Sequence, residues 1–118
     1  MRFSSELAKL DCAVALERLG GDEDLLREVA GLFLEEYPML MNEIRVAAMS
    51  GDADALQRAA HSMKGSVSNF GANGVYQAAF ALERKGRAGD LEALEVCIER
   101  LACALEHIHP ALVALSQE

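Results

Sequence analysis

Residues 52–72 read DADALQRAAHSMKGSVSNFGA and are the most informative stretch of this chain. Asp52 is a favourable helix N-cap and Gly71 a typical C-terminal cap, so one helix is expected from Asp52 to Phe70. At about 100° per residue, its apolar side chains fall on one stripe, which predicts that they are buried. The stripe consists of Leu56, Ala59, Ala60, Met63, Val67 and Phe70.

The opposite side of this predicted helix is polar and contains a glycine. His61, Gly65 and Ser68 lie about 120–180° from the apolar stripe, with Gln57 and Lys64 at its flank. We therefore expect His61 to be partly exposed, with Lys64 and Gly65 beside it. A glycine inside a helix costs about 1 kcal/mol relative to alanine. Because Gly65 faces away from the stripe, we interpret it as room for a large partner close to His61.

Acidic and amide residues, mostly after glycine or alanine, predict where the other helices begin. Asp22, Asn73 and Asp90 are the expected N-caps of three of them. A short helix is expected over about 11–19, and a long one over about 22–49. A fourth helix should end near 86–89, and a fifth should fill the remainder of the chain.

Two prolines and the short loops complete the predicted fold. Pro38 should kink the long helix, and the last helix should be kinked or broken before Pro110. Four long helices joined by short loops pack as antiparallel neighbours. The predicted fold is all-α, an antiparallel up-down four-helix bundle with a short additional N-terminal helix.

Length and composition support the all-α fold class and argue against a nucleic-acid-binding or membrane protein. At 118 residues, the chain is expected to form a single domain over 1–118. The abundance of alanine, leucine and glutamate and the absence of threonine favour helices. A net charge of −8 argues against a nucleic-acid partner. No apolar run approaches the length that a membrane span needs, and residues 1–6 lack the apolar core of a signal peptide, so we expect no membrane insertion. Three cysteines without a CxxC pair indicate reduced thiols, so we expect a cytoplasmic protein. We also expect it to be a monomer.

Acidic residues are missing from the region around His61. The chain has 19 of them, yet residues 55–82 contain none and carry only Arg58 and Lys64 as charges. Such a surface does not repel an anionic group or an acidic partner. The third and fourth helices reverse around Ala72, which lies 11 residues after His61 and 11 before Glu83. Glu83 should therefore face His61, fix the imidazole tautomer and leave the other nitrogen free as a nucleophile.

An exposed imidazole with these neighbours suits the transfer of a phosphoryl group. Neutral imidazole is a good nucleophile near neutral pH, and the Lys64 ammonium one turn away offsets the incoming negative charge. The chain has no GxxxxGK[ST] loop and no plausible magnesium cage. It is therefore expected to carry a phosphoryl group without taking one from ATP.

The string His61-x-x-Lys64-Gly65-Ser66-x-x-x-Phe70-Gly71-Ala72 resembles the signature of histidine phosphotransfer (HPt) domains. The resemblance covers nearly the whole chain and includes the Gly-Asp starts of the third and fifth helices. It implies that His61 is phosphorylated through Nε2 and that Lys64 stabilises the phosphohistidine. It also implies that Gly65 permits docking and that Glu83 holds Nδ1.

The resemblance further implies the partners. The domain would receive its phosphoryl group from an aspartate of one response-regulator receiver domain and pass it to another, in a relay that a hybrid sensor histidine kinase feeds. It would need no cofactor, since the receiver supplies the magnesium ion. The docking surface is expected to comprise Gln57, Arg58, Ser62, Gly65, Ser68 and Asn69.

Two alternatives remain open. The chain could be a module that docks receivers without being phosphorylated, or a fragment of a hybrid sensor histidine kinase. An enzymatic fragment of a histidine kinase that feeds its own ATP site is disfavoured. Its dimerisation helices usually carry an acid after the histidine and a proline nearby, which Ser62 and the following residues do not provide. Cys103, Glu106, His107 and His109 lie close together, but a zinc site needs more ligands in suitable geometry, so no metal site is predicted.

Overall fold

A computed structural model describes residue 10 and residues 12–117, with only the backbone described at residues 12 and 13. The elements are α1 (Cys12–Arg18), α2 (Glu23–Ser50), α3 (Ala53–Val67), the 3₁₀ turn η2 (Ser68–Phe70), α4 (Asn73–Ala88) and α5 (Leu94–Gln117). No strand occurs in these described parts of the chain, which confirms the all-α prediction.

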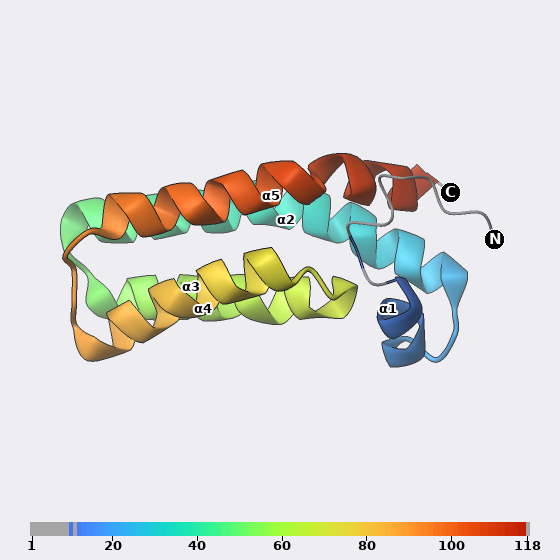
Figure 1. The fold of residues 1–118 in the computed structure, drawn as a ribbon, viewed down its shortest axis with the longest axis horizontal. Coiled ribbons are helices and arrows are strands. Elements are labelled where there is room, and N and C mark those ends of the chain that lie inside the picture. The colour runs from blue at the N-terminus through green and yellow to red at the C-terminus, as the bar shows by residue number, and fades with distance from the viewer. Residues whose placement is uncertain (1–9, 11, 118) are drawn as a thin grey trace.

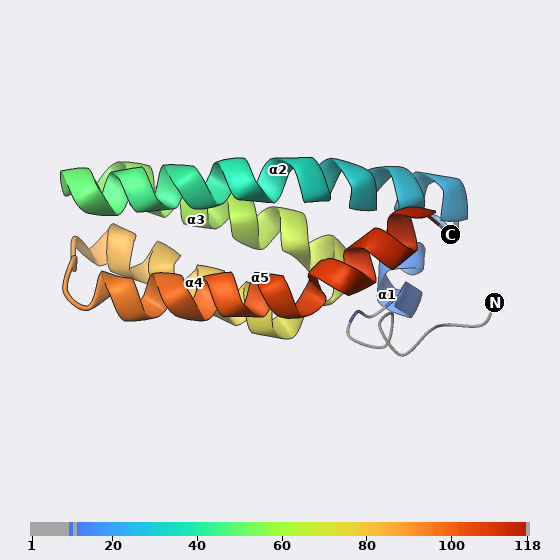
Figure 2. The same cartoon turned by 90° about the horizontal axis from the view of Figure 1, so that it is seen from above.

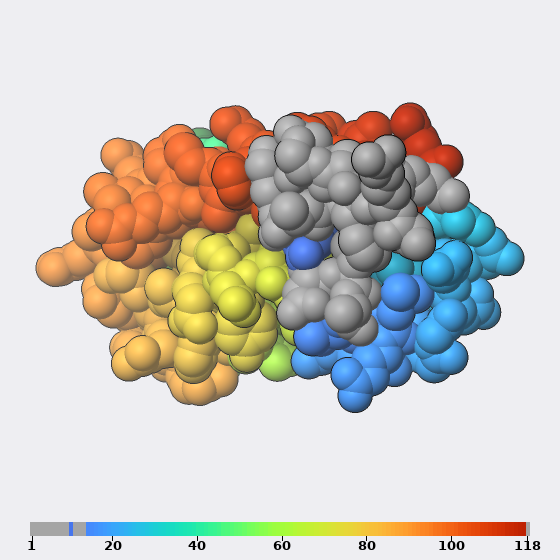
Figure 3. All heavy atoms as spheres, turned by 45° about the vertical axis from the view of Figure 1, so that its right-hand side comes forward, coloured from blue at the N-terminus to red at the C-terminus, as the bar shows by residue number. Residues whose placement is uncertain are grey.

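The four long helices form an antiparallel bundle. Each packs against its neighbours in sequence, and α5 returns to lie along α2, which closes the bundle. Figure 1 shows α2 and α5 as one layer over α3 and α4. The short α1 packs on η2 and α2, and Figure 3 shows it beside the first turns of α2. The predicted four-helix bundle with an additional N-terminal helix is confirmed.

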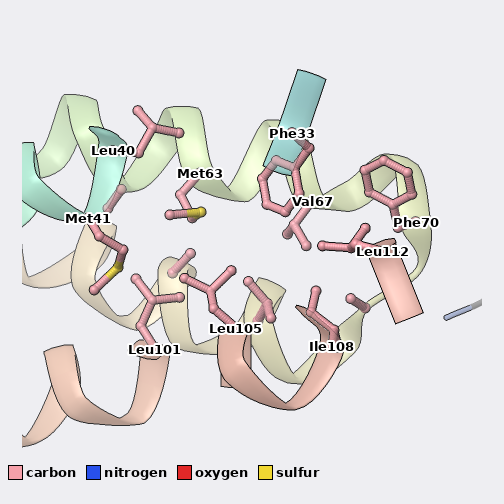
Figure 4. Close-up of a cluster of buried hydrophobic side chains, with 14 of the residues drawn as sticks. Phe33, Leu40, Met41, Met63, Val67, Phe70, Leu101, Leu105, Ile108 and Leu112 are labelled. Atoms are coloured by element: carbon pink, nitrogen blue, oxygen red, sulfur yellow. The ribbon is translucent and has the colours of Figure 1, made fainter. Parts of the chain in front are cut away.

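The core fills the space between the two layers. Figure 4 shows Phe33 of α2, Val67 of α3 and Leu112 of α5 gathered in this interior. The predicted apolar stripe of α3 and η2 is buried throughout: Leu56, Ala59, Ala60, Met63, Val67 and Phe70 are at most 5% exposed. Burial of this stripe leaves the opposite face of α3, which carries His61, at the surface.

Several helix boundaries follow the prediction. The carboxylates of Asp22 and Asp52 accept hydrogen bonds from the backbone N–H groups of Leu25 and Ala55, as N-caps do. α2 is unbroken at Pro38 and α5 at Pro110. In Figure 2 the last turns of α5 are inclined to its first part, so this helix bends instead of breaking.

Three expected boundaries are wrong. The α-helix ends at Val67 instead of Phe70, because residues 68–70 tighten into a 3₁₀ turn before Gly71 takes a left-handed φ of 63°. Asn73 is the first residue of α4 and not its cap, since the cap position is Ala72, which makes no side-chain hydrogen bond. Asp90 does not cap α5.

Asp90 instead closes the loop between α4 and α5. Its carboxylate accepts hydrogen bonds from the Glu92 backbone N–H (3.1 Å) and the Lys85 ammonium (3.2 Å). These local contacts compete with a helical start, and α5 begins only at Leu94, the next residue along that is buried in the core.

Candidate functional site

His61 projects from the middle of α3, on the side away from the buried stripe. Its side chain is 68% exposed, so a partner molecule can reach the imidazole from solvent. The exposure agrees with the angular reading of the sequence. The site is therefore an open surface around one ring and not an enclosed cleft.

Glu83 of α4 lies beneath the ring, at the height that counting along the α3–α4 hairpin predicts. Its carboxylate Oε2 is 2.5 Å from Nδ1 of His61, and its side chain is only 1% exposed. An ionised carboxylate can only accept hydrogen bonds, so Nδ1 must be the protonated nitrogen. In the neutral ring the lone pair then resides on Nε2.

Lys64 completes this cluster from one turn along α3. Its Nζ donates to the other Glu83 oxygen, Oε1, at 2.8 Å. Burial of Glu83 raises its pKa, but the hydrogen bonds and charges of Lys64 and His61 outweigh that effect and hold the pKa below its usual value. Glu83 is consequently ionised at neutral pH, and the Arg87 guanidinium 4.0 Å from Oε1 favours the same state.

The Lys64 ammonium also lies against two aromatic rings. It is 4.9 Å from the centroid of Phe80 and 5.9 Å from that of Tyr76, and its side chain is 18% exposed. Sequence reasoning placed Lys64 near an incoming phosphoryl group and did not find these contacts. Phe80 and Tyr76 precede Glu83 by three and seven residues, a spacing that puts all three on one face of a helix and would have revealed them.

The expected docking residues around His61 differ in how exposed their side chains are. Arg58, Ser62 and Gly65 are exposed, while Gln57, Ser68 and Asn69 are half-buried. A Cβ placed on Gly65 would meet nothing within 4 Å, which leaves open space next to the imidazole. The Ser68 hydroxyl donates to the Gly65 carbonyl at 2.7 Å, so its proton is already used within the chain.

Two shallow hollows flank His61. One lies between α3, α4 and α1, where Lys64, Gly65 and Tyr76 face Arg18. The other includes His61 itself and is lined also by Arg58, Arg87 and the carboxylate side chain of Asp54. Because Glu83 is buried, it adds no negative charge to the surface around His61. The exposed cations there are Arg58 and Arg87, and they outnumber the one carboxylate of that hollow, Asp54.

The other histidines and the cysteines lie elsewhere. His109 Nδ1 is 2.6 Å from the Tyr37 hydroxyl. Within residues 12–117 whose side chains are placed, no three His, Cys, Asp or Glu side chains gather as a metal site requires. Cys97 and Cys103 are free thiols, and the Cys12 side chain lies outside the described atoms. None of the described helices is both long and apolar enough to cross a membrane.

Comparison with known proteins identifies the family. The sequence profile of the Hpt domain matches residues 28–114, a span that contains the whole cluster of His61, Lys64 and Glu83. The chain therefore belongs to the Hpt domain family, whose members are phosphocarriers of two-component phosphorelays and interact with receiver domains.

A solved structure supports the same assignment. The fold is similar to that of histidine-containing phosphotransfer protein B (HptB) from Pseudomonas aeruginosa PAO1, with a TM-score of 0.77 and 27% sequence identity over 92% of each chain. The search of curated proteins found no match.

Proposed function

We propose that His61 is the phosphoryl acceptor of this protein, and that it takes the group from a receiver-domain aspartate and passes it to another receiver. One observation carries the proposal. An exposed imidazole has its Nδ1 engaged by a buried, ionised carboxylate, which leaves Nε2 as an accessible nucleophile.

The transfer step is a displacement at phosphorus. The Nε2 lone pair forms the N–P bond while the P–O bond to the receiver aspartate breaks, and the bonding electrons leave with the aspartate carboxylate. The Nδ1 proton stays hydrogen-bonded to Glu83, whose negative charge stabilises the imidazolium that results. In the second transfer, an aspartate carboxylate of another receiver attacks the phosphorus atom and the N–P bond breaks. The bonding electrons return to Nε2, which regenerates neutral His61.

Lys64 is proposed to stabilise the phosphorylated ring. An ammonium has three N–H donors. Its contact with Oε1 of Glu83 uses one of them, so Lys64 can keep that bond and donate to a phosphoryl oxygen as well. The chain itself would bind no cofactor, and the receiver would bring the magnesium ion that its acidic pocket holds.

The open surface around His61 is proposed as the docking face. Gly65 provides clearance, and Arg58, Arg87 and Arg18 of the two hollows supply positive charge for the acidic rim of a receiver. We further propose that these 118 residues form one domain, that this domain acts as a monomer in the cytoplasm, and that a hybrid sensor kinase supplies the relay with phosphoryl groups from ATP.

A labelling experiment tests the proposal. The protein is incubated with a phosphorylated receiver, and label that is acid-labile and base-stable is followed on wild type, His61→Gln and His107→Gln. His107 is an exposed histidine of α5 and serves as the matched control. Wild type and His107→Gln should take label and His61→Gln should take none. Equal labelling of all three proteins would refute the proposal, whereas receiver binding without any label would indicate a docking module.

A further inference from the structure

The α3 and α4 backbones come into unusually close contact at Gly86. A Cβ placed there would lie 2.7 Å from the backbone nitrogen of Gln57, 2.9 Å from its Cα and 2.9 Å from the carbonyl oxygen of Ala53. All three are main-chain atoms of α3, so no change of rotamer relieves the overlap. Helix interfaces tolerate such proximity only where a side chain is missing.

This contact is specific to Gly86. The other helical glycines, Gly31, Gly65 and Gly74, would each accept a Cβ with nothing inside 4 Å. Glycine is unfavourable in a helix interior, so its presence at a buried position facing another backbone has a packing cause.

Gly86 lies one helical turn from the functional cluster. It follows Glu83 by three residues on α4, and Gln57 precedes His61 by four residues on α3. Residues at these spacings share a helix face. The contact of Gly86 with Gln57 therefore sets the distance between the two helices directly beside the point where Glu83 meets His61.

We propose that Gly86 is a positioning residue for phosphotransfer, because it lets α4 approach α3 closely enough for Glu83 to hold Nδ1 of His61 and Nζ of Lys64. This inference rests on the proposed role of His61 as the phosphoryl acceptor. Gly86 itself touches neither the ring nor the phosphoryl group and acts only through the spacing of the helices.

The expected displacement follows from the distances. To bring the Cβ contact from 2.7 Å to 3.4 Å, where ordinary contact begins, the helices must separate by about 0.7 Å at this turn. The Nδ1–Oε2 distance of 2.5 Å would then lengthen to about 3.2 Å, the upper end of the hydrogen-bond range. A misplacement approaching 1 Å can reduce a rate by about a hundredfold, so Gly86→Ala should slow phosphotransfer by about ten- to a hundredfold.

The test compares Gly86→Ala with Gly31→Ala, the same substitution at an open helical position outside the site. Imidazole ¹⁵N shifts report the tautomer of His61, and a phosphorylated receiver reports the transfer rate per folded molecule. Gly31→Ala should match wild type in both. Gly86→Ala should show less protonation at Nδ1 and slower transfer. The proposal is overturned if Gly86→Ala folds and keeps both the wild-type tautomer and a transfer rate within about twofold of wild type.

A second comparison separates positioning from simple destabilisation. Leu105→Val trims a buried side chain of α5, a helix that takes no part in the α3–α4 contact, and should lower stability without shifting the His61 tautomer. If Gly86→Ala folds poorly, the His61 tautomer and the transfer rate are measured in the double variant Gly31→Ala/Gly86→Ala with trimethylamine N-oxide. The helical Gly31→Ala substitution and the osmolyte both favour the folded state. Failure to fold even there would make Gly86 a requirement of the fold and overturn the positioning role. The labelling of His61 in wild type tests the proposed function separately.

Discussion

Replacing Glu83 by glutamine removes a buried charge with almost no change of shape. The carboxylate accepts hydrogen bonds from two polar partners, at 2.5 Å from His61 and 2.8 Å from Lys64. An amide oxygen can replace one acceptor, but the amide NH₂ faces the other donor and cannot accept from it. The Lys64 ammonium is then left without its counter-charge.

The magnitude follows from these contacts. A hydrogen bond to a charged group contributes about 1.5–3 kcal/mol, and breaking a fully buried ion pair costs about 3–5 kcal/mol. The Lys64 side chain is 18% exposed and regains some hydration when its partner is neutral, so the cost should fall below the range for a fully buried ion pair. We expect Glu83→Gln to reduce the free energy of unfolding by about 2–3 kcal/mol at pH 7.

The loss should depend on pH in one direction. Because the pKa of Glu83 is lower in the folded than in the unfolded chain, its ionisation stabilises the fold above the unfolded pKa of about 4.3. That stabilisation disappears as the pH falls through the lower, folded-state pKa. The difference between wild type and Glu83→Gln should thus shrink as Glu83 becomes protonated, when the pH falls below about 4.3.

Urea unfolding of both proteins between about pH 3 and pH 8 measures this difference. A double-mutant cycle with Lys64→Met isolates the contribution of the ion pair, and Glu83→Gln should cost less in the Lys64→Met background. A variant within about 0.5 kcal/mol of wild type at pH 7, or a difference that does not change with pH, would show that Glu83 is not the ionised partner of Lys64.

Two further substitutions test a contact and a backbone conformation that the structure revealed. Phe80→Leu removes the ring 4.9 Å from the Lys64 ammonium and should cost about 0.5–1 kcal/mol beyond the loss of apolar area. Urea titration should find a smaller extra cost in the Lys64→Met background, where only the Arg84 guanidinium, 5.7 Å from the ring centroid, remains over the ring. Ala93 has a positive φ of 55° in the α4–α5 loop, a conformation that costs alanine about 1–2 kcal/mol. Ala93→Gly should therefore raise the midpoint of thermal unfolding. The control Ala81→Gly places a glycine inside α4 and should lower that midpoint.

The start of α5 shows why a helix boundary can escape sequence reasoning. Glycine, proline and capping residues report local preferences, and those preferences located every long helix to within a few residues. Asp90 has the same preference as Asp22 and Asp52, yet the Lys85 side chain and the Glu92 backbone claim its carboxylate. Whether an aspartate caps a helix or bonds another side chain depends on which groups lie near it in the folded structure, so the residue pattern alone does not predict the outcome.

The sequence by itself determined which face of α3 is buried, that His61 points outward, and that Glu83 stands opposite it. Each of these depends on helical periodicity and on counting residues through one tight reversal, and both quantities are local. Only the tertiary structure decided that Lys64 bonds Glu83 and lies on Phe80, and that Gly86 brings α4 onto the backbone of α3. Those contacts depend on the distance between two helices, which the packing of the whole bundle sets and no spacing along the chain specifies.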